Sequence, residues 1–272
     1  MKRLLLFCSL LLTYPCIASA AERIISLAPH ATELAFAAGL GDKLIAVSEF
    51  SDYPEQAKML PTVANFQAIN IERIVRLQPD LVIAWPEGNA LRELEKLTRL
   101  GIPIFYSHPK QLLDIADEIE QLSHYAKNPA VGLQAAKDFR QQLDQLHQRY
   151  AHLAPTRYFY QLSEKPIITL AQNNWPSEIF RICGGENVFQ NSPSPYPQVS
   201  IEQVLLAQPE VIFTSQHAMR DGTMWNKWRE QLMVGKPSYI WPLNPDWLNR
   251  PTPRTLMAIE QVCGYFEQKQ AP

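Results

Sequence analysis

The stretch Asn70-Ile-Glu-Arg-Ile-Val-Arg-Leu-Gln-Pro-Asp-Leu-Val-Ile-Ala84 recurs 130 residues later as Ser200-Ile-Glu-Gln-Val-Leu-Leu-Ala-Gln-Pro-Glu-Val-Ile-Phe-Thr214. Isoleucine, glutamate, glutamine and proline stand at the same places in both copies. Each copy predicts a capped helix, a proline that ends it because proline lacks an N–H, and an apolar strand. The repeat predicts two halves of similar design, although unrelated helix–turn–strand units also look alike.

Short apolar runs alternate with helical patterns on either side of both copies. We expect strands at 23–27, 44–48, 81–85, 102–106, 157–162, 167–170 and 211–215, and helices at 31–38, 71–77, 90–100, 177–183, 201–207 and 253–268. Such alternation is typical of α/β proteins whose sheets are mostly parallel and covered on both faces.

The segment between the two halves has a different pattern, with apolar residues at helical steps from about 129 to 153. A helix of about 22 residues would be about 33 Å long, enough to pass from one domain to another. A surface helix within one lobe is the alternative. We predict an N-terminal α/β lobe at 21–127, a bridging helix at 128–154 and a C-terminal α/β lobe at 155–272.

The first twenty residues are typical of a cleavable secretory signal peptide. Lys2 and Arg3 precede an apolar run that is too short to span a bilayer, and small residues at 18–20 supply a cleavage pattern. Lipidation at Cys16 and an uncleaved anchor are the alternatives. We therefore predict a periplasmic protein whose mature chain does not insert into the membrane.

Charge and cysteine content narrow the possibilities further. Removing Lys2 and Arg3 from the 25 basic residues leaves 23 against 27 acidic ones, a balance that does not suit nucleic acid. Beyond the predicted signal only Cys183 and Cys263 remain. In an exported chain two cysteines predict one disulfide, with two separate buried thiols as the alternative.

Nothing in the sequence indicates catalysis or a resident metal or cofactor. The G-x-S-x-G, P-loop and H-E-x-x-H motifs are absent, and the six histidines are scattered. A periplasmic hydrolase would need a nucleophile–base pair, for which Ser51-Asp52 and Ser163-Glu164 are poor candidates.

The candidate site residues follow predicted strands or lie in proline-rich loops. Ligands of parallel sheets bind beyond the carboxyl ends of the strands, and aromatic linings suit large, partly apolar ligands. Each ring has an alternative role in packing, which is the role we assign to Trp241. The candidates are His30, Phe50, Phe66, Trp85, Tyr196, Asp246 and Trp247.

Glu72 and Glu202 stand at equivalent places in the two copies, two residues after each helix cap. The helix dipole alone favours a carboxylate at either place. One carboxylate in each half also suits docking onto a transporter with two-fold symmetry, where arginines would receive them.

Several stretches, some within the repeat and some outside it, are similar to a known family, and together they cover nearly the whole predicted mature chain. They are Thr32–Gly39, Ser51–Pro54, Glu72–Val75, Pro79–Trp85, Cys183–Asn187, Pro197–Ser200 and Asp246-Trp247. On these residues the chain resembles the periplasmic vitamin B12 (cobalamin)-binding proteins of enteric bacteria and vibrios, which are solute-binding proteins of ABC importers.

The resemblance implies a class III periplasmic binding protein, monomeric, with two lobes joined by one helix. Cobalamin would be a transported ligand in the gap between the lobes rather than a cofactor. Glu72 and Glu202 would dock onto the BtuC-type permease of a BtuCD-type ABC importer. The family's ligand-facing aromatics fall on Phe50, Phe66, Trp85 and Tyr196, and an acidic contact falls on Asp246.

This chain departs from that family at several of these positions. Phe50, Phe66 and Tyr196 replace tyrosine, tryptophan and tryptophan, and Leu162 and Ile168 replace phenylalanines. His30 replaces an alanine and is expected to contact the ligand, with cobalt ligation as a weaker alternative. The choice of corrinoid therefore stays open. A haem or iron-siderophore receptor of the same fold is the rival, and a metal receptor is opposed by the scattered histidines.

Overall fold

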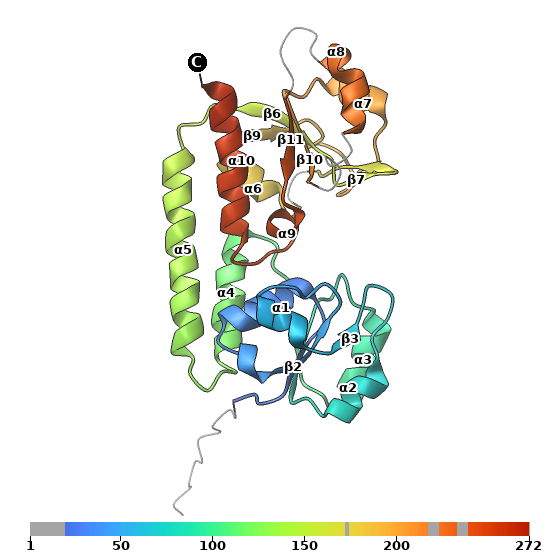
Figure 1. Cartoon of the computed structure of the whole chain (residues 1–272), viewed down its shortest axis with the longest axis vertical. Coiled ribbons are helices and arrows are strands. Elements are labelled where there is room, and N and C mark those ends of the chain that lie inside the picture. Colours follow the sequence, from blue (N-terminus) through green and yellow to red (C-terminus); the bar gives the residue numbers. More distant parts are fainter. Residues whose placement is uncertain (1–19, 172–173, 217–222, 233–238, 272) are drawn as a thin grey trace, which may run out of the picture.

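The computed structural model describes residues 20–171, 174–216, 223–232 and 239–271. The predicted signal peptide lies outside these ranges except for Ala20. The first half forms a five-stranded parallel sheet of order β3-β2-β1-β4-β5 (Figure 1). Its strands are β1 (Ile24–Ser26), β2 (Leu44–Ser48), β3 (Thr62–Ala64), β4 (Leu81–Ala84) and β5 (Ile104–Tyr106).

Helices cover both faces of this first sheet. One face packs on α1 (Pro29–Ala37) and α4 (Leu112–Ser123), and the other on α2 (Ile71–Leu77) and α3 (Leu91–Arg99). Strands buried on both faces explain why their sequences are continuous apolar runs.

The second half repeats this plan with a four-stranded parallel sheet of order β11-β10-β6-β9 and an antiparallel β7–β8 hairpin. The strands are β6 (Thr156–Tyr160), β7 (Ser163–Glu164), β8 (Ile167–Ile168), β9 (Gly185–Asn187), β10 (Val211–Ser215) and β11 (Tyr239–Leu243). The helices are α6 (Ser177–Ile182), α7 (Ile201–Ala207), α8 (Arg229–Leu232), α9 (Pro245–Leu248) and α10 (Thr255–Gln270).

The predicted disulfide is confirmed. Cys183 and Cys263 are joined by an S–S bond of 2.08 Å, which ties the end of α6 to α10. Both cysteines are fully buried. The bond therefore fastens the last long helix onto the second sheet.

A 21-residue helix, α5 (Ala130–Tyr150), lies along one side of the molecule beside α4 and α10 (Figure 1). Near its start Gly132 lets the backbones approach, because a Cβ there would lie 3.0 Å from Cα of Ala38. Residues of α4, α5 and α10 join one hydrophobic cluster that extends over one face of both sheets. The predicted α/β class with two mostly parallel sheets is confirmed, whereas the domain boundaries at 21–127, 128–154 and 155–272 stay predictions.

The two repeat copies have the same local structure. Asn70 and Ser200 cap α2 and α7 by accepting hydrogen bonds from the third backbone N–H, and both helices span seven residues. Both end at a glutamine in the left-handed region, Gln78 with φ 48° and Gln208 with φ 46°. The two copies therefore share their backbone geometry as well as their sequence pattern.

The structure shows that each half also has an equivalent arginine, which comparison of the two sequence copies missed. Arg23 donates from its guanidinium to the last carbonyls of α2, with 2.6 Å to the oxygen of Leu77, and Arg157 donates to the carbonyl of Ala207 at the end of α7. In each half the acidic residue after the proline, Asp80 or Glu210, accepts a hydrogen bond from the backbone N–H of that arginine.

Candidate ligand-binding site

The carboxyl edges of the two sheets meet through ion pairs. Asp52, which follows β2, lies 2.5 Å from Nη1 of Arg250, which follows α9. Glu33 of α1 accepts two hydrogen bonds from the guanidinium of Arg254, at 2.6 and 2.8 Å. Because loops after the strands of one sheet contact loops after the strands of the other, the two edges face each other.

The pair of Glu33 and Arg254 is well shielded from solvent. The side chains of Glu33 and Arg254 are 2% and 13% exposed. Although burial tends to raise the pKa of Asp52, the hydrogen bond and charge of Arg250 outweigh it and hold that pKa below its ordinary value. Arg254 also lies 4.3 Å from the centre of the Tyr53 ring, a cation–π distance. The cluster fixes how the two halves meet.

Four of the predicted aromatic residues present large side chains to solvent. Phe50 is 65% exposed after β2, Phe66 is 80% exposed after β3, Trp85 is 39% exposed after β4, and Tyr196 of the second half is 48% exposed. Phe50 also has φ 62°, a conformation that side chains other than glycine rarely adopt. Exposed rings of this size, gathered at strand ends, are typical of ligand contacts.

Trp85 is held in place from three directions. Its backbone N–H donates to Oδ1 of Asn89 at 2.8 Å, and the amide of Asn89 donates in turn to the carbonyl of Leu27. A Cβ on Gly88 would lie 1.9 Å from the indole, so only glycine allows this ring position. His30 meets the indole edge-on, with the ring centroids 5.4 Å apart.

His30 itself is a buried, neutral residue. Only 5% of it is exposed, and burial lowers its pKa to about 4, with the charges of Arg250 and His108 acting in the same direction. Nε2 has no hydrogen-bond partner among the residues that the structure describes.

Tyr196 connects the second half to the loop that follows Trp85. Burial raises the pKa of Tyr196, and the charge of Glu87 raises it further. Glu87 lies 2.5 Å from Nδ1 of His108. Tyr196 is therefore within electrostatic reach of the loop that carries Trp85, although the two rings belong to different sheets.

The remaining predicted ligand residues are less exposed than these rings. Asp246 in α9 lies 3.0 Å from Arg250 and so belongs to the ion-pair cluster. Trp247 is partly buried and packs against the main hydrophobic cluster. Leu162, which is 38% exposed, donates its backbone N–H to the carbonyl of Ile168, so these two positions lie side by side at the β7–β8 hairpin.

The arrangement of sheets and ring-bearing loops is that of a known family. A model of the periplasmic binding protein family matches residues 24–236. The chain belongs to that family. A vitamin B12-binding protein of Vibrio cholerae is 64% identical over 92% of this chain and 91% of its own length, and one of Yersinia pestis is 48% identical over 96% and 91%.

Solved structures agree with this family membership. The periplasmic vitamin B12-binding protein BtuF of Vibrio cholerae superposes with a TM-score of 0.88 at 63% identity, covering 93% of this chain and 99% of that chain. A periplasmic haem-binding protein, RhuT of Roseiflexus, gives a TM-score of 0.80 at 22% identity, covering 93% and 100%, and shows the fold alone. The resemblance found in the sequence is confirmed, and with it the assignment to solute-binding proteins rather than enzymes.

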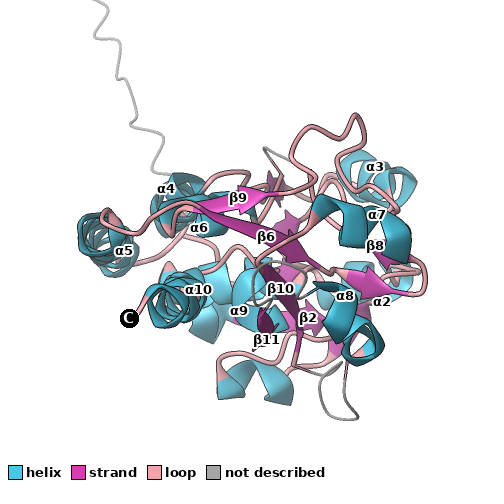
Figure 2. Ribbon diagram, turned by 90° about the horizontal axis from the view of Figure 1, so that it is seen from above, coloured by secondary structure: helices cyan, strands magenta, loops and turns pink. Residues whose placement is uncertain are grey.

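Glu72 and Glu202 are exposed in the first turns of α2 and α7. The hydroxyl of Ser200 donates to Glu202 and lowers its pKa. Both helices lie on the side of the molecule away from α5 (Figures 1 and 2). The helices that carry the two glutamates therefore lie on the same side of the molecule, one from each half.

Other kinds of site find little support. Oγ of Ser51 is buried and hydrogen-bonded to the hydroxyls of Thr32 and Ser48, and Asp52 is engaged by Arg250. Within the described ranges, no three His, Cys, Asp or Glu side chains gather as metal ligands would. In the same part of the chain, every helix is too short or too polar to cross a bilayer.

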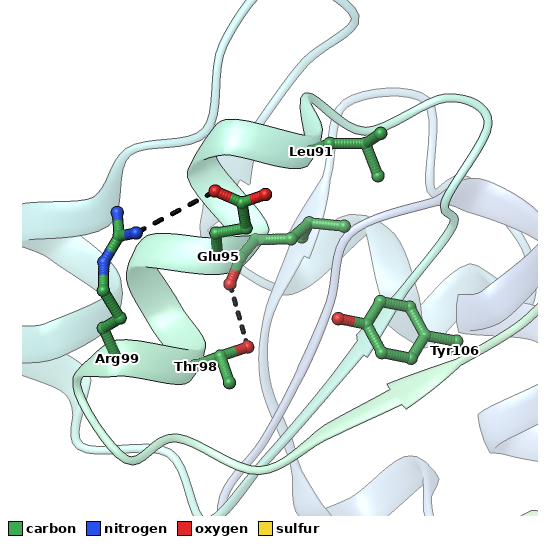
Figure 3. A pocket seen from close by; sticks show the side chains of 6 residues that line it. Leu91, Glu95, Thr98, Arg99 and Tyr106 are labelled. Atoms are coloured by element: carbon green, nitrogen blue, oxygen red, sulfur yellow. Dashed lines mark hydrogen bonds and ion pairs between the residues drawn. The ribbon is translucent and has the colours of Figure 1, made fainter.

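One surface hollow of about 490 Å³ lies along α3 and is lined by none of the candidate ligand residues (Figure 3). Its polar groups are paired locally: Arg99 lies 3.9 Å from Glu95, and Thr98 donates to the carbonyl of Leu94. Leu91 and Tyr106 complete an open, shallow wall.

Sequence reasoning missed the residues that hold the site together. Glu33, Arg250 and Arg254 carried no local signal, because the pairs that they form join residues about two hundred positions apart. Gly88 and Asn89 offered more, since a glycine and an asparagine three and four residues after a tryptophan predict a tight turn beside the ring.

Proposed function

We propose that this chain is a periplasmic solute-binding protein that captures cobalamin between the carboxyl edges of its two sheets. The observation that carries the proposal is the set of exposed rings from both halves, Phe50, Phe66, Trp85 and Tyr196, around edges that ion pairs bring together. The proteins named vitamin B12-binding at 48–64% identity support the same ligand.

The charge around these rings favours cobalamin over haem. Four carboxylates, those of Glu33, Asp52, Glu87 and Asp246, accompany two guanidinium groups, those of Arg250 and Arg254. Haem carries two propionates, which this surplus of negative charge would repel. Cobalamin has a periphery of neutral amides, whose N–H groups suit carboxylate and other oxygen acceptors.

Calorimetric titration of the mature protein with cyanocobalamin tests the ligand. We expect saturable binding at one site, and haem should fail to compete at equal concentration. Trp85→Ala should weaken binding about tenfold or more, because it removes a ring that stacks on the ligand. Tyr125→Ala is the matched control: Tyr125 is 37% exposed, but it lies at the amino edge of the first sheet, where its carbonyl accepts from Ala21. Haem binding without cyanocobalamin binding would overturn the proposal.

We further propose delivery to a BtuCD-type ABC importer through Glu72 and Glu202, which would contact arginines of the BtuC-type permease. The carboxylates are exposed at equivalent places on one side of the molecule, as docking to a two-fold-symmetric partner requires. The chain would reach the periplasm by cleavage of residues 1–20 and act as a monomer.

Charge reversal at both glutamates tests delivery separately from capture. Glu72→Arg with Glu202→Arg should bind cyanocobalamin normally and lose affinity for the reconstituted importer. Asp144→Arg, an exposed carboxylate on α5, is the control and should keep both properties. Normal importer affinity in the doubly reversed variant would refute the docking assignment.

A further inference from the structure

His30 carries a buried hydrogen-bonding atom that the described residues leave unused. Its side chain is 5% exposed, and Nε2 has no partner among them. A backbone hydrogen bond with Ser107 raises the pKa of the ring, as a bond from a ring N–H to a carbonyl does. The proton therefore sits on Nδ1, and Nε2 presents a bare lone pair. Buried acceptors without donors are rare and costly, so this one calls for an explanation.

The surroundings of His30 keep the imidazole uncharged. Burial is the largest cause that lowers its pKa to about 4; the hydrogen bond with Ser107 opposes it, and electrostatic interactions with Arg250 after α9 and His108 after β5 add to the lowering. At neutral pH the ring accepts at Nε2 and cannot donate there.

The atom lies next to the proposed ligand surface. The ring of His30 meets that of Trp85 at an interplanar angle of 89°, and Trp85 is one of the exposed aromatics of the site. Nε2 is covered in the empty protein, so a ligand reaches it only if a neighbouring side chain moves. Trp85, whose ring meets that of His30 and which is 39% exposed, is a neighbour that a ligand at the site would contact.

On the basis of the proposed function, we propose that Nε2 of His30 accepts a hydrogen bond from a side-chain amide N–H of the bound corrinoid. This hydrogen bond selects ligands that carry amides over ligands that carry carboxylates. An amide supplies the donor that the lone pair lacks. A carboxylate supplies only acceptors, so it would set lone pair against lone pair and bury a charge without compensation. The site thus rejects the ligand that cannot complete its hydrogen bond.

Two matched corrinoids test this selectivity: dicyanocobinamide, whose side chains are amides, and dicyanocobyrinic acid, whose side chains are carboxylates. Both lack the nucleotide loop, and they differ at every peripheral side chain, one of which His30 would contact. The role of His30 is therefore measured by how a substitution changes the preference between them, and not by the preference itself. His30→Phe keeps a flat ring against Trp85 and removes the acceptor. His30→Gln is the rescue variant, because its Oε1 can accept a hydrogen bond near the position of Nε2.

We expect the wild type to prefer dicyanocobinamide, and His30→Phe to narrow that preference about fivefold to tenfold, the effect of one lost hydrogen bond. His30→Gln should restore most of the preference. An unchanged preference in His30→Phe, or an equal loss of affinity for both corrinoids, would overturn the role of His30 while leaving cobalamin capture intact. Failure of the wild type to bind cyanocobalamin would instead refute the proposed function itself.

Discussion

Replacing Glu33 by glutamine removes the negative charge from the ion pair that joins the two halves and that is best shielded from solvent. Glu33 receives both hydrogen bonds of the Arg254 guanidinium, at 2.6 and 2.8 Å, and only 2% of its side chain is exposed. A neutral glutamine accepts one of these bonds at most and leaves the buried guanidinium with only the weaker attraction of Asp246 and Asp52.

The magnitude follows from the burial of the pair. Breaking a buried ion pair by removing one partner costs about 3–5 kcal/mol. Arg254 keeps its contact with the Tyr53 ring, so we expect about 2–4 kcal/mol for Glu33→Gln. For a chain of this length that corresponds to a melting temperature roughly 5–15 °C lower.

Thermal unfolding followed by circular dichroism checks this value, with the double variant Glu33→Leu, Arg254→Met as the control. Removing both charges together should bring the free energy of unfolding back to within about 1 kcal/mol of the wild type, because neither charge is then buried alone. If Glu33→Gln melted within 1 °C of the wild type, the ion pairs would not be what holds the two edges together.

Three further outcomes can be tested on single variants. Phe50→Gly should raise the free energy of unfolding by about 1 kcal/mol in denaturant titrations, since φ 62° then carries no steric cost, while cyanocobalamin binding weakens because a ring is lost; lower stability would contradict the strain. Gly88→Ala should weaken cyanocobalamin binding about tenfold and shift the Trp85 fluorescence, since a Cβ would overlap the indole, and an unaltered spectrum would contradict it. Burial raises the pKa of Glu118 from 4.5 to about 7, so folding favours its protonated form and stability falls as pH rises from 4.5 to 7. The Glu118→Gln variant should lose less stability than the wild type between pH 4.5 and 7, as measured by melting temperatures. An equal fall in melting temperature in both proteins would argue against the raised pKa of Glu118.

Local sequence signals were sufficient for several elements, among them both helices of the repeat. The helices 71–77 and 201–207 and the strands 44–48 and 211–215 were predicted with the bounds that the structure shows. Each of these helices has a polar cap, a proline stop and a buried neighbour, so several independent preferences agree.

Elements with weaker or longer-range determinants were missed. β3 and β9 are three residues each, too short for a periodic pattern, and they form only because neighbouring strands pair with them. α4 was missed although it carries a usable signal, since Asp114 accepts from the backbone of Gln111 and Ile115, Ile119 and Leu122 repeat at helical steps.

The site was predicted as a set of residue types at strand ends, and its assembly could not be. Trp85 and Phe50 follow strands, which placed them at one edge from sequence alone. That Asp52 would pair with Arg250, which lies 198 positions further along the chain, depends on a contact between distant segments. No pattern within a short window encodes such contacts.

The arginine at the start of each half, Arg23 or Arg157, has a consequence for how such chains diverge. Because each half closes the end of its repeat helix with its own arginine, that local structure does not depend on the other half. Recombination between related genes could therefore exchange one half as a unit and recover both sheets. Contacts across the crossover must still match, among them those of Glu33 with Arg254, Asp52 with Arg250 and the backbone N–H of Leu112 with Glu178, so these positions help to decide which chimaeras assemble.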